Sequence, residues 1–415
     1  MELESISQPA LEQIDRLQGA DLVVGVLDAD GNGGPAASAA MIREVLPKFS
    51  DAARAVLIVD DGTPGPRLED QQPLSVLYCK LSEPNVTTEA SPQSIFEAYQ
   101  TIFGLSGRIG ARACGVIASD LRTVTPEWID RLVRPALEME FDLVAPLYAR
   151  HKWEGLLNRS VLSPLSRALY GKRIENPMGP DFGLSGKLMR RILDDYADLR
   201  RNAPRQPLAS LASIAIQGNF KICQTHVGTR AHPPTEGTDV SSLLAQVLGP
   251  VFVDMDRNAA VWQRVRGSQP LPDFGEPEPA PAETGAVDVR RMIDSFKLGA
   301  ANLQDVWSQV LPPTTLFEIR KLSRLPPDQF RMPDSLWVWI VYDFALGHRF
   351  RTINRDHLLR SFTPLYLGWI ASYALEMEDA DPAAVEARLE RLARAYETGK
   401  PYLVSRWRWP DRFNP

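Results

Sequence analysis

Acidic side chains directly follow two of the apolar, β-branched runs in the first half of the chain. The run VLIV is followed by Asp60 and Asp61 and a glycine turn, and the run VIA is followed by Ser119 and Asp120. A carboxylate after a buried strand can accept hydrogen bonds from a nucleobase or from ribose hydroxyls. Asp120 could also hold a hard divalent cation against a diphosphate. The alternative for each is a capping or turn residue.

Two later loops carry further candidate residues. The segment NPMGPDFGLSG, residues 176–186, has the glycine and proline density of a shaped loop and contains Gly179 and Asp181. His232 lies in the proline-rich segment that follows the apolar run at 220–227. A loop histidine can ligate a metal, although it is more often a surface residue, and Asp181 can equally be a turn residue.

The elements that position these residues alternate between short apolar runs and helical patterns. We expect strands in the segments 21–27, 55–59, 74–81, 113–118, 142–148 and 220–227, with stretches between them that are long enough for crossover helices. Unbroken apolar strands that alternate with helices favour an α/β fold with a largely parallel sheet covered on both faces. Ligands bind at the carboxyl ends of the strands of such a sheet, where the candidate residues lie.

A linker rich in proline, glutamate and alanine divides the chain. It predicts three parts: a sheet domain at 1–265, the linker at 266–287, and an all-helical domain at 288–415 with helical apolar periodicity. The tryptophans of the last part are expected to lie in the core or at an interface.

Composition excludes several classes of protein. The chain has 415 residues, 24% of them charged, a net charge of -6 and no long basic run, which argues against disorder and against nucleic acid as a partner. The three cysteines, which lie far apart in apolar stretches, are expected to be buried free thiols. The apolar stretches are shorter than a membrane span requires and the N-terminus lacks a signal-peptide pattern, so we expect a cytoplasmic location.

Taken in order, these elements match the layout of the GT-A (Rossmann-like) nucleotide-sugar glycosyltransferases. The segments VIASDLRTVTPEWI, APLYARHKWEGLLN, LYGKRIENPMGPDFGLSG, TPLYLGW and YETGKPYLVSRW resemble the bacterial family that includes mannosylglycerate synthase and glucosylglycerate synthase. The resemblance spans nearly the whole chain, including the helical C-terminal part.

The resemblance implies a retaining transfer of glucose or mannose from a UDP- or GDP-hexose to a small carboxylate acceptor such as glycerate. Asp60, Asp61, Ser119 and Asp120 would bind the nucleotide, and Asp120 with His232 would hold Mg²⁺ or Mn²⁺, which stabilises the charge on the leaving diphosphate. Asp120 and Asp181 would be the catalytic carboxylates.

The acceptor side of the site is implied in the same way. Arg150, His151, Lys152 and Asn158 belong to the loop that would face the acceptor, and Arg150 suits its carboxylate because a guanidinium binds a carboxylate through two parallel hydrogen bonds. Gly179 and Asp181 would lie near the transferred sugar. A homodimer is also expected.

Several positions depart from the family pattern and support an alternative. The expected acidic pair Asp-x-Asp begins with Ala118, the expected glycine-rich, lysine-bearing loop reads SPQSIFEAYQ, and an expected arginine is Trp369. The alternative is therefore a binding or regulatory protein that keeps the glycosyltransferase fold without turnover.

Overall fold

The computed structural model describes most of the chain in two compact units. The described residues are 12, 14–15, 17, 19–27, 34–49, 54–59, 67–79, 92–118, 123–202, 208–230, 240–281 and 287–409. The sheet unit comprises residues 1–149, 174–234 and 271–281, and the helical unit comprises residues 150–173, 235–270 and 282–415.

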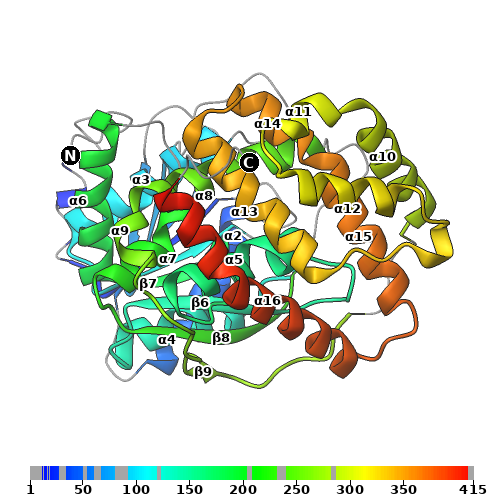
Figure 1. Cartoon of the computed structure of the whole chain (residues 1–415). Coiled ribbons are helices and arrows are strands. Elements are labelled where there is room, and N and C mark those ends of the chain that lie inside the picture. The colour runs from blue at the N-terminus through cyan, green and yellow to red at the C-terminus, as the bar shows by residue number, and fades with distance from the viewer. Residues whose placement is uncertain are drawn as a thin grey trace. The chain divides into compact units, whose positions relative to one another are not determined.

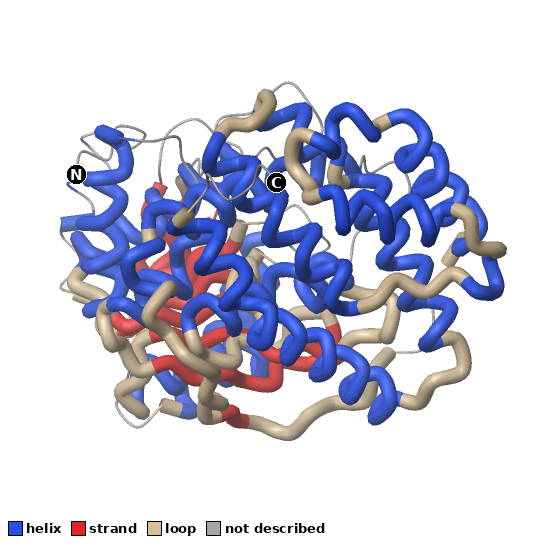
Figure 2. Tube along the Cα trace, in the orientation of Figure 1, coloured by secondary structure: helices blue, strands red, loops and turns tan. Residues whose placement is uncertain are grey.

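The sheet unit contains one nine-stranded sheet, which Figure 2 shows in red. Its strand order is β3-β4-β2-β1-β5-β7-β6-β8-β9. All neighbouring strands pair in parallel except at the edge strand β3 and at β7, which is antiparallel to both of its neighbours. The strands are β1 (Leu22–Val26), β2 (Ala55–Val59), β3 (Arg67–Gln71), β4 (Leu74–Tyr78), β5 (Ala113–Ile117), β6 (Leu143–Ala149), β7 (Phe182–Ser185), β8 (Ile222–Thr229) and β9 (Asp273–Phe274).

Helices cover both faces of this sheet, because alternate residues of the central strands point into two separate apolar cores. One core joins the sheet to α3 (Pro92–Ile109), α6 (Gly186–Asn202) and α7 (Leu208–Gln217). The other joins it to α2 (Gly34–Val45), the short helix η1 (Leu46–Lys48) and α4 (Pro126–Glu138). The α/β fold with a mostly parallel sheet is therefore confirmed, and it fits the expected GT-A type.

Close approach of a helix fixes the residue type at the centre of β7. A Cβ atom on Gly183 would lie 2.1 Å from the carbonyl oxygen of Leu132 in α4, so only glycine fits there. The neighbouring strand β5 has a similar constraint at Gly115, whose Cβ would lie 2.6 Å from a methyl group of Val133. These glycines let α4 pack directly on the strands that lead to the candidate site.

The helical unit is built from an all-helical C-terminal part and from two segments that precede it in the chain. Figure 1 shows its longest helix, α16, in red. Its elements are η2 (Asn158–Leu162), α5 (Ser163–Tyr170), α8 (Val240–Arg257), α9 (Ala259–Trp262), α10 (Val289–Asn302), α11 (Gln304–Ser308), α12 (Pro313–Ser323), η3 (Pro327–Gln329), α13 (Asp334–Phe350), α14 (Arg355–Ser361), α15 (Thr363–Met377) and α16 (Pro382–Arg408).

The contacts divide the chain differently from the sequential boundary expected at residue 265. Helix α5 packs against α16, and α8 packs against α13 and α14, so segments 150–173 and 235–265 belong to the helical unit. Part of the proline-rich stretch, in turn, returns to the sheet, because β9 pairs with β8. The apolar faces of α5 and α8 find their partners in the C-terminal helices, and this pairing overrides sequence order.

Burial confirms the expected buried thiols and most of the expected core. Cys79, Cys114 and Cys223 are buried free thiols. Four of the six C-terminal tryptophans are buried, so they lie in the expected core, whereas Trp339 is 36% exposed and Trp409 is 63% exposed. In the part of the chain that the structure describes, no helix combines the length and the apolarity needed to span a membrane.

Candidate functional site

The carboxyl ends of the parallel strands meet at one edge of the sheet. The last residue of β1, Val26, lies level with Val59 at the end of β2 and with Ile117 at the end of β5. Since β7 runs antiparallel to its neighbours, its amino end lies at this same edge. Asp181, the residue before β7, therefore stands beside the ends of β5 and β6, where ligands bind in sheets of this kind.

Asp181 links three strands through its carboxylate. One oxygen accepts a hydrogen bond from the backbone N–H of Ala118, just past β5, at 2.8 Å. The other accepts a hydrogen bond from the hydroxyl of Tyr148, in β6, at 2.5 Å. The Asp181 side chain is fully buried. Because both donors are directed at a buried charge, these are the stronger, charge-assisted kind of hydrogen bond.

A guanidinium group lies next to this carboxylate. Arg230 follows β8 directly, its Nε lies 4.0 Å from Asp181 Oδ2, and its side chain is 21% exposed. Its Cζ atom also lies 5.7 Å from the centre of the Tyr148 ring. The buried carboxylate is thus balanced by a cation that still reaches solvent at the edge of the sheet, and such a cation can also bind an anionic ligand.

Aromatic side chains position Tyr148 and the residue that precedes Asp181. The Tyr148 ring packs against Trp128, in the first turn of α4, with 5.8 Å between ring centres. The hydroxyl of Tyr99, in α3, donates to the carbonyl of Pro180 at 3.1 Å. Burial, together with the negative charge of Asp181, raises the pKa of Tyr99 well above its ordinary range, so this phenol remains a proton donor.

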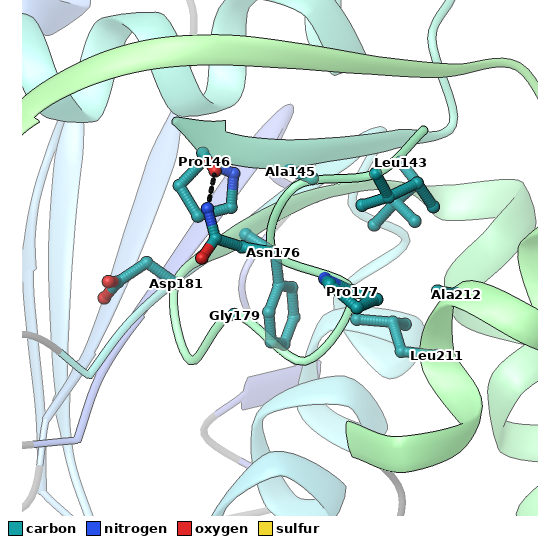
Figure 3. A pocket seen from close by; sticks show the side chains of 11 residues that line it. Leu143, Ala145, Pro146, Asn176, Pro177, Gly179, Asp181, Leu211 and Ala212 are labelled. Carbon is teal, nitrogen blue, oxygen red and sulfur yellow. Dashed lines mark hydrogen bonds between the residues drawn. The ribbon is translucent and has the colours of Figure 1, made fainter. Parts of the chain in front are cut away.

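The loop that leads to Asp181 is packed tightly on β6. The Asn176 side-chain amide donates to the Pro146 carbonyl at 2.8 Å, and the Gly179 N–H donates to the Asn176 carbonyl at 3.1 Å. Figure 3 shows the first of these bonds, with Asp181 at the end of the same loop. A Cβ atom on Gly179 would lie 3.1 Å from the Pro146 ring. The cavity that this loop encloses, about 10 Å³, holds at most about one water molecule, and on this side Gly179 packs against β6.

The four residues expected to face an acceptor belong to the helical unit. The Lys152 amino group donates to the carbonyl of Glu378, at the C-terminus of α15, at 2.5 Å, where a cation also complements the helix dipole. The His151 N–H donates to the Glu154 carboxylate at 2.8 Å. The Arg150 guanidinium lies against Gly155, where an added Cβ atom would come within 2.7 Å of Nη1.

Asn158 begins the single π-helical turn η2. The carbonyl of Ser160 in this turn accepts hydrogen bonds from the Trp337 indole at 3.1 Å and from the Tyr396 hydroxyl at 2.8 Å. Turns of this type are rare and often occur at functional sites. The structure thus places Arg150, His151, Lys152 and Asn158 on one short segment that the C-terminal helices hold.

The structure places the predicted site residues in two groups and leaves a third group undescribed. Gly179 and Asp181 lie together at the sheet edge, and the four acceptor candidates lie together in the helical unit. The predictions for Asp60, Asp61, Ser119, Asp120 and His232 fall outside the described residues. Sequence reasoning missed Tyr148 and Arg230. Arg230 could have been found, because a cation directly after a strand satisfies the same rule that selected Asp120.

The described residues show no ready-made site for a divalent metal. They contain no group of three or more histidine, cysteine, aspartate or glutamate side chains that could hold an ion. Both oxygens of Asp181 already accept hydrogen bonds. The two residues predicted to hold a divalent metal, Asp120 and His232, lie outside the described residues.

Comparison with solved structures gives matches to sugar transferases. Glucosyl-3-phosphoglycerate synthase from Mycobacterium tuberculosis, in complex with Mg²⁺ and UDP, is 16% identical over 60% of this chain and 83% of that chain, with a TM-score of 0.36. Mannosyl-3-phosphoglycerate synthase from Rubrobacter xylanophilus is 12% identical over 63% of this chain and 82% of that chain, with a TM-score of 0.33. These names agree with the resemblance found in the motifs, but at such TM-scores the matches carry no argument about function.

No protein-family model and no curated protein sequence matches the chain.

Proposed function

We propose that this chain is a glycosyltransferase that moves glucose or mannose from a UDP- or GDP-hexose to a small carboxylate acceptor such as glycerate, with retention and with the help of Mg²⁺ or Mn²⁺. The observation that carries the proposal is the junction at the sheet edge, where buried Asp181 joins Ala118 and Tyr148 beside Arg230.

The candidate nucleotide and metal residues closely follow the ends of the strands that meet at this edge of the sheet. Asp120 comes two residues after Ala118, and His232 comes two residues after Arg230. Asp60 and Asp61 follow β2, which ends level with β1 and therefore with β5. The segments that carry these four residues thus leave the sheet at one edge, as a nucleotide site between parallel strands requires.

The charges at this edge suit departure of a nucleoside diphosphate. When the bond between the anomeric carbon and the β-phosphate oxygen breaks, negative charge develops on the leaving group. Arg230 offers a fixed guanidinium near that charge, and Asp181 and Tyr148 hold this guanidinium in orientation. A divalent ion held by Asp120 and His232 would supply Lewis-acid stabilisation of the same charge. The acceptor carboxylate is proposed to bind Arg150, with His151, Lys152 and Asn158 close to it in sequence.

Calorimetric titration with UDP and with GDP, each with and without Mn²⁺, tests the proposal. We expect one nucleotide to bind, with an affinity that Mn²⁺ raises at least about tenfold, and we expect Asp120→Ala to abolish the metal effect. Asp194→Ala is the matched control, because Asp194 is exposed on α6, outside the loops that follow the parallel strands. An unchanged metal effect in Asp120→Ala would refute the assignment of Asp120 as a ligand.

The alternative, a nucleotide-binding protein without turnover, is favoured by one observation. Ala118 occupies the first position of the expected acidic pair, and its N–H is directed at Asp181. Incubation with the identified nucleotide hexose and glycerate separates the two functions. Release of nucleoside diphosphate that depends on acceptor supports the transferase, and tight nucleotide binding without such release supports the alternative.

A further inference from the structure

The acceptor candidates lie on a short segment whose start is fastened to α15. The segment comprises residues 150–160 of the helical unit, and its candidates are Arg150, His151, Lys152 and Asn158. The Lys152 carbonyl accepts a hydrogen bond from the hydroxyl of Tyr373, in α15, at 3.2 Å. The Tyr373 ring also packs against Trp153, the next residue of the segment, with 5.9 Å between ring centres. One residue of α15 thus contacts both the backbone and a side chain near the start of the segment.

The end of the segment is fastened to α13 and α16. The Ser160 carbonyl accepts two hydrogen bonds, from the Trp337 indole of α13 at 3.1 Å and from the Tyr396 hydroxyl of α16 at 2.8 Å. The Ser160 hydroxyl is buried and forms no hydrogen bond with a described residue, so this residue is held through its backbone. The preceding side chain, Arg159, forms an ion pair with Glu386 of α16. Two helices therefore hold the π-helical turn.

A continuous aromatic stack joins the two fastening points. The Trp369 ring is stacked on the Tyr373 ring, with 5.2 Å between ring centres and 13° between ring planes. The Trp369 ring also lies 5.8 Å from the ring of Trp337. All three side chains are buried, and the helices that carry them are drawn in orange in Figure 1. Because buried rings pack with few voids, this stack keeps the two donors at a fixed separation.

The two phenols remain proton donors at neutral pH. Burial raises the pKa of Tyr373 to about 12, and it raises the pKa of Tyr396 well above its ordinary range. Neither hydroxyl loses its proton between pH 5 and pH 9. The carbonyls of Lys152 and Ser160 therefore keep these partners throughout the range in which activity is measured.

We propose that Trp337, Tyr373 and Tyr396 are positioning residues that hold the segment 150–160 in the conformation that binds the acceptor carboxylate. This inference rests on the proposed function and adds residues that act through the segment. A π-helical turn is a rare conformation, so contacts from outside the segment are expected to maintain it. A segment that is already ordered loses less conformational entropy when it binds a ligand. Loosening the segment should therefore weaken acceptor binding.

Two conservative variants remove one hydrogen bond from each fastening point. Tyr373→Phe and Tyr396→Phe, alone and together, delete the hydroxyls and keep the buried rings. Hydrogen–deuterium exchange of the full-length protein without ligand measures how readily the segment opens. We expect peptides from residues 150–162 to exchange about fivefold faster for each hydrogen bond removed. Circular dichroism verifies that each variant is folded.

A third buried phenol of the helical unit provides the matched control. Tyr170, in α5, donates a hydrogen bond to the Asp254 carboxylate of α8 at 2.6 Å, and its side chain is buried. Tyr170→Phe therefore makes the same chemical change in the same unit, at a hydrogen bond that joins two other helices. It should leave the exchange of the segment 150–160 within about twofold of the original protein.

Initial rates separate a positioning role from a general loss of stability. At saturating nucleotide hexose, the double variant Tyr373→Phe/Tyr396→Phe should raise KM for glycerate about tenfold or more and leave kcat within about twofold, as loss of acceptor binding requires. Its Kd for the nucleotide, measured by calorimetry, should stay within about twofold. A general loss of stability would instead reduce the amount of active enzyme, and it would lower kcat without a change in KM.

Two results would overturn the inference. The first is exchange of the segment in the double variant that is no faster than in Tyr170→Phe, and this result counts whether or not the protein is a transferase. The second is an active double variant whose KM for glycerate is unchanged. Failure of the proposed function is a separate outcome, because the original protein would then release no nucleoside diphosphate in response to glycerate. The exchange measurement would still decide whether the two phenols hold the segment.

Discussion

Removal of the Asp181 carboxylate should destabilise the sheet unit more than any exposed substitution. Asp181→Ala deletes both acceptors, and it leaves the Ala118 N–H and the Tyr148 hydroxyl without this partner at a fully buried position. Each buried donor that loses its partner costs about 1–3 kcal/mol, and loss of one member of a buried charged pair costs about 3–5 kcal/mol. We therefore expect Asp181→Ala to lower the free energy of unfolding by about 3–5 kcal/mol.

Two milder variants separate the contributions to this loss. Tyr148→Phe removes one charge-assisted hydrogen bond and keeps the ring against Trp128, so it should cost about 1.5–3 kcal/mol. Asp181→Asn keeps one acceptor oxygen but removes the charge that faces Arg230. Because Asp181 and Tyr148 share one contact, the double variant Asp181→Asn/Tyr148→Phe should lose at least about 1 kcal/mol less than the sum of the single losses.

Urea denaturation followed by circular dichroism measures these free energies, with Asp194→Asn on the exposed face of α6 as the control. The control should change stability by less than about 0.5 kcal/mol. A loss below about 1 kcal/mol in Asp181→Ala, or strict additivity in the double variant, would show that the carboxylate does not link the strands as described.

Two further predictions concern a buried acid and a close packing contact. Burial raises the pKa of Asp343 to about 7, although Arg406 and the hydrogen bond from Tyr402 act in the opposite direction. This folded-state pKa lies above the unfolded value of about 3.9, so the contribution of Asp343 to stability is complete below about pH 4 and is lost as the pH rises through 7. Relative to Asp343→Asn, the protein should therefore gain stability from pH 8 to pH 5. A difference between the two proteins that stays constant with pH in urea denaturation would contradict this. Gly183→Ala should lower stability by about 1–3 kcal/mol or more, because its Cβ would lie 2.1 Å from the Leu132 carbonyl oxygen. Gly107→Ala is the control inside α3, where the Cβ would make only an ordinary contact at 3.6 Å, and it should raise stability by about 0.5–1 kcal/mol. Thermal melts measure both effects, and equal effects would refute the packing argument.

Six strands, β1, β2, β4, β5, β6 and β8, could be predicted from the sequence, because each falls within a predominantly apolar run that alternates with helical patterns. The three strands that the sequence did not reveal lack this signal. Strand β3 is polar and lies at an edge, β7 has four residues including Gly183, and β9 has two residues inside a proline-rich stretch. These strands form because they pair with strands that are distant in sequence, and such pairing leaves no apolar pattern within a short stretch of sequence.

The candidate site shows the same division between local and long-range information. Asp120 was found by the rule that residues after a parallel strand lie at the ligand edge. That rule offers no reason for Asp181, which comes before a strand, because the sequence does not show that β7 is antiparallel. The partition of the chain was equally hidden, since α5 and α8 join the helical unit through contacts with α13, α14 and α16.

The position of Asp181 determines how loss of activity at this residue must be interpreted. Its two oxygens accept hydrogen bonds from Ala118 and Tyr148, so we expect a substitution that removes an acceptor to disturb the ends of β5 and β6. A fall in turnover would therefore not distinguish a carboxylate that touches the sugar from one that positions the strands. Tyr148→Phe makes the distinction, because it disturbs the same junction and leaves the carboxylate in place. If Asp181 acts by positioning, the two variants should weaken metal-dependent nucleotide binding in proportion to their losses in stability; a direct contact with the sugar would lower turnover in Asp181→Asn alone.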